Sequence, residues 1–235
     1  MAPLSSPDAL SICGNPSSVT LDIGHSPGRP GAISSRGKME YEFNRTLALA
    51  LAPALRVIGF QTEVLNEERT EISLAKRAAQ LNAIRQGIII SLHHDSVQPQ
   101  YLKGGIFDGK AVAFSRHAEG FSIFVSRKSS GFEKSKDLAR RIGSELRKAG
   151  FVPSLHHAEP IKGEGRPIVD PALGVFRFDG LSVLKSAQVP AVLLEAGVIV
   201  NPEEERRLES VVGQQRLVRA IVSGVEAYCR GTPSD

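Results

Sequence analysis

Two histidines and two glutamates stand where their side chains could share a metal ion or transfer protons. Three of the four directly follow short apolar runs: VTLDIG precedes His25, GIIISL precedes His93 and PAVLL precedes Glu195. Ligands of open α/β sheets bind beyond the carboxyl ends of the strands, so these three side chains are expected to converge. A single strand-end histidine is more often a hydrogen-bonded core residue. The agreement of three strand ends favours a metal site or an acid–base site.

Glu40 opens the first predicted helix, where the helix dipole favours a carboxylate. Alone, it would be read as a helix-start acid without further role. Together with His25 and His93 it completes two imidazoles and one carboxylate, the ligand set of a catalytic zinc that keeps an open position. His94 adjoins His93 and could be the ligand instead. Because side chains alternate along a strand, only one of these two histidines can face the site.

The elements that must position these residues alternate between short apolar runs and longer amphipathic stretches, which predicts an α/β fold. We expect a three-layer αβα architecture of the phosphorylase/hydrolase-like kind, with a mostly parallel or mixed twisted sheet of about six strands. We expect a tail over residues 1–17 and a single catalytic domain over 18–231, since no Gly/Ser linker divides the chain. The clearest strands are predicted at 19–24, 61–65, 87–92, 121–126 and 190–194.

Helices are predicted from apolar spacing and from capping residues. Ser135 is expected to cap one of them, and Asn201 begins another that reaches about Tyr228, with a possible break at Gly213. Residues 151–175 show no clear period and are expected to form a long loop of the kind that often carries function. The predicted helices are 40–58, 73–86, 135–149, 181–186 and 201–228.

Composition excludes several function classes. A hydrophobic fraction of 41% with 23% charged residues is ordinary for a soluble globular protein. The net charge is +4, but lysines and arginines are spread along the chain, so nucleic-acid binding is not indicated. A mildly basic surface would suit an anionic polymer. No stretch approaches the roughly 20 apolar residues of a membrane helix, and no secretory signal is visible at the start.

The two cysteines, Cys13 and Cys229, lie near opposite ends of the sequence. Neither has a neighbour at metal-ligand spacing, so a zinc–thiolate site is not favoured. In an oxidising compartment they could form a disulfide that stabilises the fold by roughly 4–5 kcal/mol. Two unrelated buried thiols are an equally good interpretation.

Three segments carry a resemblance to a known family: LDIGHSPGRPGAISSRGKMEYEFN, SLAKRAAQLNAIRQGIIISLHHDS and VLKSAQVPAVLLEAGVIVNPEE. In this order, across residues 19–205, they resemble the zinc-dependent N-acetylmuramoyl-L-alanine amidases that act on peptidoglycan. That family has Gly-His after the first strand, a Glu opening the next helix, Ser-x-His ending a later strand, and a Glu in a Pro-Ala-hydrophobic-Glu-x-Gly run. The resemblance implies that His25, Glu40 and His93 bind Zn²⁺ and that Glu195 is the catalytic carboxylate.

Other positions match the family or depart from it. Asn66-Glu67 replaces a common Thr-Arg pair, and Ser26-Pro27 follows His25 in place of two glycines. The region between His94 and Gly120 is short and polar for the regulatory helix that some members carry over the zinc, so an open site is expected. The recurrent family positions, implied to be structural hydrogen-bonding residues, are Asn44, Arg77, Asn82 and Asn201.

The resemblance implies zinc-dependent hydrolysis of the amide bond between N-acetylmuramic acid and L-alanine in peptidoglycan, by a periplasmic or secreted monomer acting in cell-wall remodelling or lysis. Two alternatives stay open: a zinc carboxypeptidase-type amide hydrolase, and a cell-wall-binding module without catalysis. No arginine clamp for a terminal carboxylate is obvious, which disfavours the first, and the complete ligand set disfavours the second. In or beside the long loop, His156, His157 and Arg177 are candidate substrate contacts, although a solvated loop is the favoured interpretation.

Overall fold

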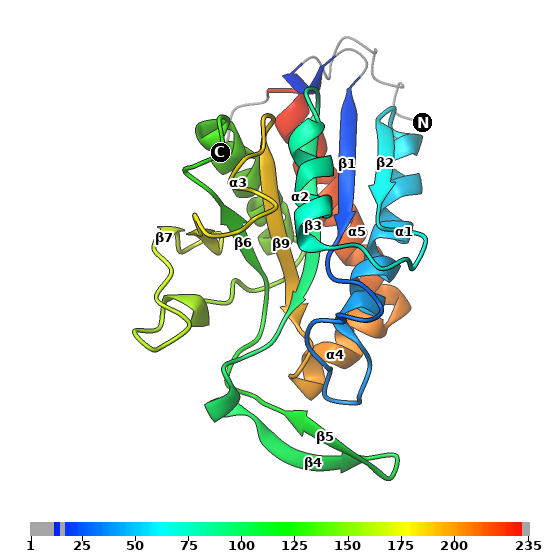
Figure 1. The fold of residues 1–235 in the computed structure, drawn as a ribbon, viewed down its shortest axis with the longest axis vertical. Helices are drawn as coiled ribbons and strands as arrows, with labels where there is room; N and C mark the ends of the chain where they lie inside the picture. Colours follow the sequence, from blue (N-terminus) through cyan, green and yellow to red (C-terminus); the bar gives the residue numbers. More distant parts are fainter. Residues whose placement is uncertain (1–11, 15–16, 232–235) are drawn as a thin grey trace.

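A twisted mixed sheet forms the centre of the protein (Figure 1). The computed structural model describes residues 12–14 and 17–231, and over these the sheet has seven strands in the order β2-β1-β3-β9-β6-β8-β7. β2, β1, β3 and β9 run parallel, β6 is antiparallel to β9, and β7 is antiparallel to β8. The strands are β1 (Ser18–Ile23), β2 (Gln61–Leu65), β3 (Ile88–Asp95), β6 (Ser122–Val125), β7 (Ile168–Asp170), β8 (Val175–Arg177) and β9 (Ala191–Val198).

The predicted α/β class and the mixed, mostly parallel sheet are confirmed. The main sheet has two strands more than the five clearest predictions, because β7 and β8 have three residues each and lie in or next to the stretch 151–175 that shows no period. Their pairing depends on Phe176, which is fully buried against the rest of the sheet.

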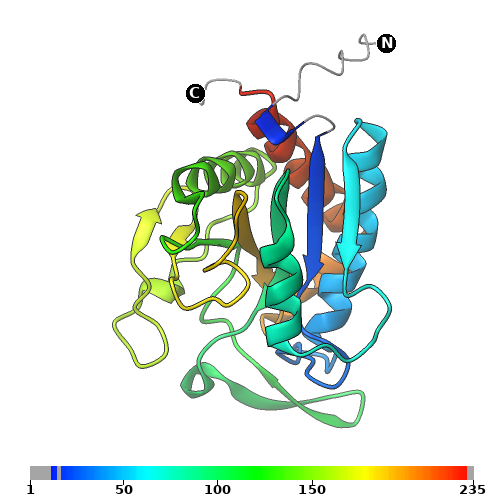
Figure 2. The ribbon, with the colours of Figure 1, turned by 45° about the horizontal axis from the view of Figure 1, so that its top comes forward.

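Helices cover both faces of the sheet, which produces the three expected layers (Figures 1 and 2). The alternation of β3 shows the two sides: Ile88, Ile90 and Leu92 join the core beneath α1, α3 and α5, whereas Ile89 joins a second core with Leu81 of α2. The helices are α1 (Glu40–Val57), α2 (Leu74–Ala83), α3 (Phe132–Lys148), α4 (Pro202–Glu209) and α5 (Val211–Cys229). None of the described helices is both long and apolar enough to cross a bilayer.

Three helix predictions were wrong in detail. Ser135 does not cap α3, which begins at Phe132; its hydroxyl donates to the Gly131 carbonyl and accepts from the Ala191 amide. Residues 181–186 form turns. The final predicted helix breaks at Ser210, whose hydroxyl caps α5 by accepting from the Gly213 amide.

A two-stranded antiparallel hairpin, β4 (Lys103–Phe107) and β5 (Lys110–Phe114), extends away from the main sheet (Figure 1). Before it lies only the three-residue 3₁₀ helix η2 (Pro99–Tyr101). The expectation that no inserted helix lies between His94 and Gly120 is therefore confirmed. No residue of either hairpin strand is buried, and the Ile106 residue is 80% exposed, so the hairpin adds little to the core.

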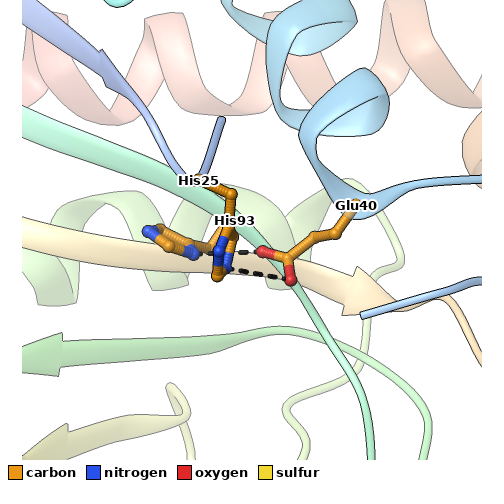
Figure 3. Close-up of side chains that lie close together, drawn as sticks. All are labelled: His25, Glu40 and His93. Carbon is orange, nitrogen blue, oxygen red and sulfur yellow. Dashed lines mark hydrogen bonds and ion pairs between the residues drawn. The ribbon is translucent and has the colours of Figure 1, made fainter. Parts of the chain in front are cut away.

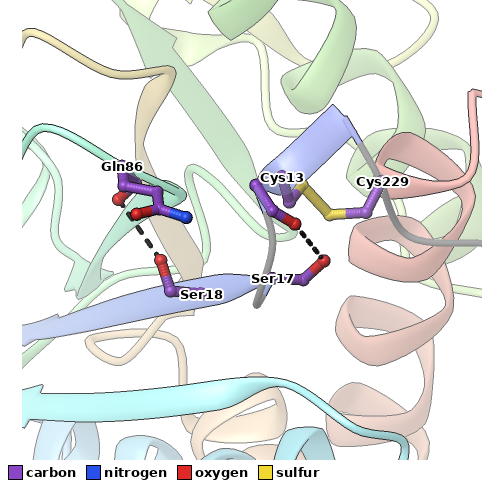
Figure 4. Close-up of a disulfide and its surroundings, with 6 residues drawn as sticks. Cys13, Ser17, Ser18, Gln86 and Cys229 are labelled. Atoms are coloured by element: carbon purple, nitrogen blue, oxygen red, sulfur yellow. Dashed lines mark hydrogen bonds between the residues drawn. A yellow bond between two sulfur atoms is a disulfide. The ribbon is translucent and has the colours of Figure 1, made fainter. Parts of the chain in front are cut away.

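A disulfide joins Cys13 to Cys229, at the end of α5, across a sequence separation of 216 residues (Figure 4). Of the two interpretations of these cysteines, the structure has the bonded pair, and both residues are buried. Most of the tail predicted for residues 1–17 lies outside the described residues.

Loss of this disulfide should destabilise the protein. Closing so long a loop removes conformational entropy from the unfolded chain, so the free energy of unfolding should fall by up to about 4–5 kcal/mol in the variant Cys13→Ala/Cys229→Ala. Urea unfolding followed by circular dichroism measures the difference. Reductant should lower the unfolding midpoint of the wild type and leave that of the variant unchanged. Equal midpoints for all four samples would show that the bond does not constrain the chain.

Candidate metal centre

Two neighbouring parallel strands and one helix start bring three predicted ligands together (Figure 3). His25 follows β1, His93 lies in β3 and Glu40 is the first residue of α1. The Glu40 carboxylate lies between the two imidazoles: its Oε2 is 3.1 Å from Nε2 of His25, and its Oε1 is 3.0 Å from Nδ1 of His93. The ligand atoms of all three lie within 4.8 Å of one another, which is a spacing that one metal ion can bridge.

The backbone at His25 is held in an unusual conformation. Its φ of 68° lies in the left-handed region, which non-glycine residues rarely occupy. The Asn66 side-chain amide donates to the carbonyls of both Ile23 and His25, which fixes this turn. Asn66, at the position where the family pattern is broken, therefore has a structural role that its sequence context did not indicate.

Glu40 is buried and fully engaged by hydrogen bonds. Oε2 accepts from the Ala32 amide, and Oε1 accepts from the Asn44 side chain and the His94 amide. Burial opposes ionisation, but hydrogen bonds and charge from His25 and His93 outweigh it and hold the pKa of Glu40 well below its ordinary value. Glu40 is therefore a carboxylate at neutral pH, as a metal ligand must be.

Two glycines leave the space that the cluster occupies. A Cβ atom on Gly24 would lie 2.5 Å from the His93 ring, and one on Gly31 would lie 2.6 Å from the His25 ring. Gly31 also has a φ of 77°, which favours glycine. Larger residues at either position would displace an imidazole.

His93 and His94 face opposite sides of the sheet, as strand alternation predicts. His94 Nδ1 is 2.8 Å from Oδ1 of Asn44, and its ring packs against Phe43 in α1. Burial lowers the pKa of His94 to about 4, so it is neutral. His93 is the member of the pair that joins His25 and Glu40.

Glu195 lies on β9 in register with His93, so both side chains project from the same face of the sheet. Its Oε2 is buried and has no hydrogen-bond partner in the described part of the chain. Burial raises the pKa of Glu195 well above its ordinary value, and the carboxylates of Asp95 and Glu40 raise it further. A buried carboxyl whose pKa is raised in this way is suited to proton transfer.

Two adjoining cavities give access to these groups. One, of about 370 Å³, is lined by His25 and His93 together with apolar side chains that include Leu181 and Leu193. The other, of about 210 Å³, shares both leucines and is lined by Glu195. The predicted ligands and the predicted acid–base residue therefore face two cavities that share Leu181 and Leu193 in their walls.

Three of the four residues at recurrent family positions make the expected structural hydrogen bonds. Asn44 bridges the Gly24 carbonyl, Glu40 and His94. Nη1 of buried Arg77 donates to the His25 carbonyl at 3.5 Å, and its Nε forms an ion pair with Asp22 at 3.2 Å. Asn201 caps α4 by accepting from the Glu203 and Glu204 amides. The fourth is different: Oδ1 of Asn82 is buried without a hydrogen-bond partner in the described residues.

The interpretation of residues around 156 as a solvated loop was wrong. His156 is 7% exposed, and both His156 and His157 face the carboxylate of Asp95. Burial works against a charge on His157, but Asp95 and Glu164 prevail and raise its pKa to about 9. The adjacent His-His pair was visible in the sequence, but its partner Asp95 lies in a strand far away along the chain.

Comparison with known proteins finds a family whose sequences are similar to this chain. A sequence model of the family described as N-acetylmuramoyl-L-alanine amidase (Amidase_3) matches residues 19–227. The N-acetylmuramoyl-L-alanine amidase AmiC of Neisseria meningitidis serogroup B is 25% identical, over 89% of this chain and 52% of its own length. Rv3717 of Mycobacterium tuberculosis, an amidase of the same description, is 26% identical over 84% of this chain and 72% of its own. This chain thus spans about half the length of the Neisseria protein.

The fold is also shared with solved structures. The crystal structure of the N-acetylmuramyl-L-alanine amidase Ami1 from Mycobacterium smegmatis superimposes with a TM-score of 0.71. The alignment covers 92% of this chain and 97% of that one, at 22% identity. The similarity extends over the sheet and its helices, so it concerns the whole fold.

Proposed function

Because this chain belongs to the Amidase_3 family of N-acetylmuramoyl-L-alanine amidases, we propose that it hydrolyses the amide bond between N-acetylmuramic acid and L-alanine in peptidoglycan, with Zn²⁺ bound by His25, Glu40 and His93. The observation that carries the proposal is the placement of two imidazoles around one buried carboxylate. Glu195, in register with His93, is proposed as the acid–base residue.

The donor set fits zinc. Two imidazole nitrogens and a carboxylate form a common catalytic zinc set that leaves a coordination position for solvent or substrate. The carboxylate is ionised, and Asn44 and the Ala32 amide fix its orientation. When bound, zinc would lower the pKa of water towards ~7 and polarise the amide carbonyl.

The protein's own groups would handle the protons and the substrate. Glu195 would accept the proton of the attacking water and return it to the departing amine of L-alanine. The raised pKa of Glu195, caused by burial, favours a carboxyl group that can take up a proton and return it. The apolar wall of the cavity, formed by residues such as Leu181 and Leu193, would limit water around the scissile bond.

Basic side chains at the cavity suit an anionic polymer. Arg29 and Arg77 line it beside the predicted metal ligands. Arg77 is already paired with Asp22, which leaves Arg29 as the group proposed to contact a carboxylate of the stem peptide. A carboxypeptidase would need such a clamp for the terminal carboxylate of its substrate, so that alternative is kept as an outcome of the test below.

A periplasmic or secreted location is proposed for this enzyme. Peptidoglycan lies outside the cytoplasm, and disulfides such as Cys13–Cys229 persist in oxidising compartments. A monomer is proposed, because one chain supplies all three predicted metal ligands as well as Glu195.

Digestion of purified peptidoglycan tests the function. We expect mass spectrometry to find free stem peptides that begin at L-alanine, a chelator to abolish their release, and added Zn²⁺ to restore it. Loss of a single terminal residue from the stems would indicate the carboxypeptidase instead. Binding of peptidoglycan without any product would indicate a module without catalysis.

A further inference from the structure

A second cluster of metal-ligating side chains lies apart from His25, Glu40 and His93. It combines Asp95, the last residue of β3, with His156 and His157, which open the 3₁₀ helix η3 (His156–Ala158). We propose that this second cluster binds a divalent transition-metal ion of the zinc class, independently of the first.

The donor atoms have the spacing of a metal site. Oδ2 of Asp95 is 3.3 Å from Nε2 of His156 and 2.8 Å from Nε2 of His157, and all donor atoms of the cluster lie within 4.8 Å of one another. A tetrahedral zinc with bonds of about 2.0–2.1 Å places its ligands about 3.3 Å apart. Small side-chain movements would therefore suffice to enclose an ion.

The remaining nitrogen of each ring is already occupied. Nδ1 of His156 shares a hydrogen bond of 2.9 Å with the Ser154 hydroxyl, and Nδ1 of His157 shares one of 2.9 Å with Glu164. Glu164 is fixed in turn by the side-chain amide of Gln98. Such outer contacts orient the histidine ligands of metals, and here they leave each Nε2 directed at Asp95.

A hydrogen-bonded network without metal is the competing explanation, and it accounts for only half of the cluster. A proton on His157 Nε2 would satisfy one contact with Asp95. Nε2 of His156 is buried, faces the same oxygen, and has no hydrogen-bond partner in the described residues. The centroids of the His156 and His157 rings are 4.0 Å apart, so protonating both imidazoles would place two positive charges together. One divalent cation satisfies both nitrogens and the carboxylate.

The position of the cluster suggests what the ion would do. His157 and Glu164 line the same cavity of about 210 Å³ as Glu195. An ion here would tie the segment around 156–164 to the end of β3 and fix that wall of the cavity. The inference does not depend on the amidase activity, since it rests on a different set of ligands.

Zinc stoichiometry tests the proposal. We expect the chelator-stripped full chain to bind two Zn²⁺ in calorimetric titration and elemental analysis. His25→Ala should bind one, His156→Asn/His157→Asn should bind one, and the combined variant none. His117→Asn is the matched control, because this histidine pairs with Glu159 outside both clusters and should leave two zinc ions bound.

A second measurement guards against misfolding of the double variant. Co²⁺ added to His25→Ala, whose second cluster is intact, should produce visible absorption bands of an imidazole-ligated ion at one equivalent. One zinc in the wild type together with no cobalt bands in His25→Ala would overturn the second site while leaving the first unaffected. Two zinc ions retained by His156→Asn/His157→Asn would overturn it as well.

Discussion

Replacing Glu195 with glutamine should lower kcat for peptidoglycan hydrolysis by about 10²–10⁴-fold, the usual contribution of a general acid–base residue. Glutamine keeps the shape of the side chain but cannot take up a proton or return it. Glu195 is not among the predicted metal ligands, so zinc content should match that of the wild type. Release of stem peptides, measured by chromatography at saturating substrate, gives kcat for both proteins.

The control for this substitution is Glu63→Gln, a glutamate on the exposed side of edge strand β2. It removes the same charge from a strand and should leave kcat within a factor of two or so, because surface substitutions away from the site have small effects. A Glu195→Gln protein that hydrolyses peptidoglycan at the wild-type rate would remove this residue from the mechanism. A protein that has lost its zinc would instead make Glu195 a ligand.

The central strands and the first metal cluster could be predicted because local pattern and tertiary position coincide there. β1, β3 and β9 are buried on both faces, so β3 and β9 begin as continuous apolar runs and β1 is interrupted only by Thr20 and Asp22. Their parallel pairing brings their polar terminal residues to one edge of the sheet. Alternation then separates His93 from His94. Each step needs only the sequence and the rules of sheet geometry.

The other features depend on contacts that no local pattern contains. β7 and β8 have three residues each, too few to show a period, and they exist because Phe176 packs into the sheet. Asp95 reads as the polar end of a strand and His156 as a loop residue until the fold brings them within 3.3 Å. The break was predicted at Gly213 and lies at Ser210, because a glycine that can end a helix lies only three residues after the serine that caps the start of α5.

The two clusters also differ in how the chain supports them. Glu40 is bound at the start of a helix and held by backbone amides of two separate segments, so its position follows from the sheet and α1. His156 and His157 lie on a three-residue helix within a long connection, and their contacts to Asp95 hold that connection in place. If both clusters bind metal, removing the ions should therefore increase the mobility of residues 156–158 more than that of the start of α1.

Substituting Glu40 with alanine should weaken zinc binding at the first cluster by more than about 100-fold and abolish hydrolysis. Loss of a residue that merely supports a ligand costs about 10–100-fold in metal affinity, and Glu40 is proposed as a ligand itself. Competition with a chromophoric chelator measures the affinity. The second cluster shares no residue with the first, so the variant should still bind one zinc ion at Asp95, His156 and His157.

Glu42→Gln is the matched control for this substitution, since Glu42 also lies in the first turn of α1 but pairs with Arg69 at the surface. It should keep wild-type zinc affinity and activity, which separates ligand loss from the removal of a helix-dipole charge. Thermal melting of the metal-free proteins checks that the alanine variant folds. If folded Glu40→Ala still held zinc at the first cluster with unchanged affinity, His25 and His93 would suffice and the carboxylate would have only a structural role.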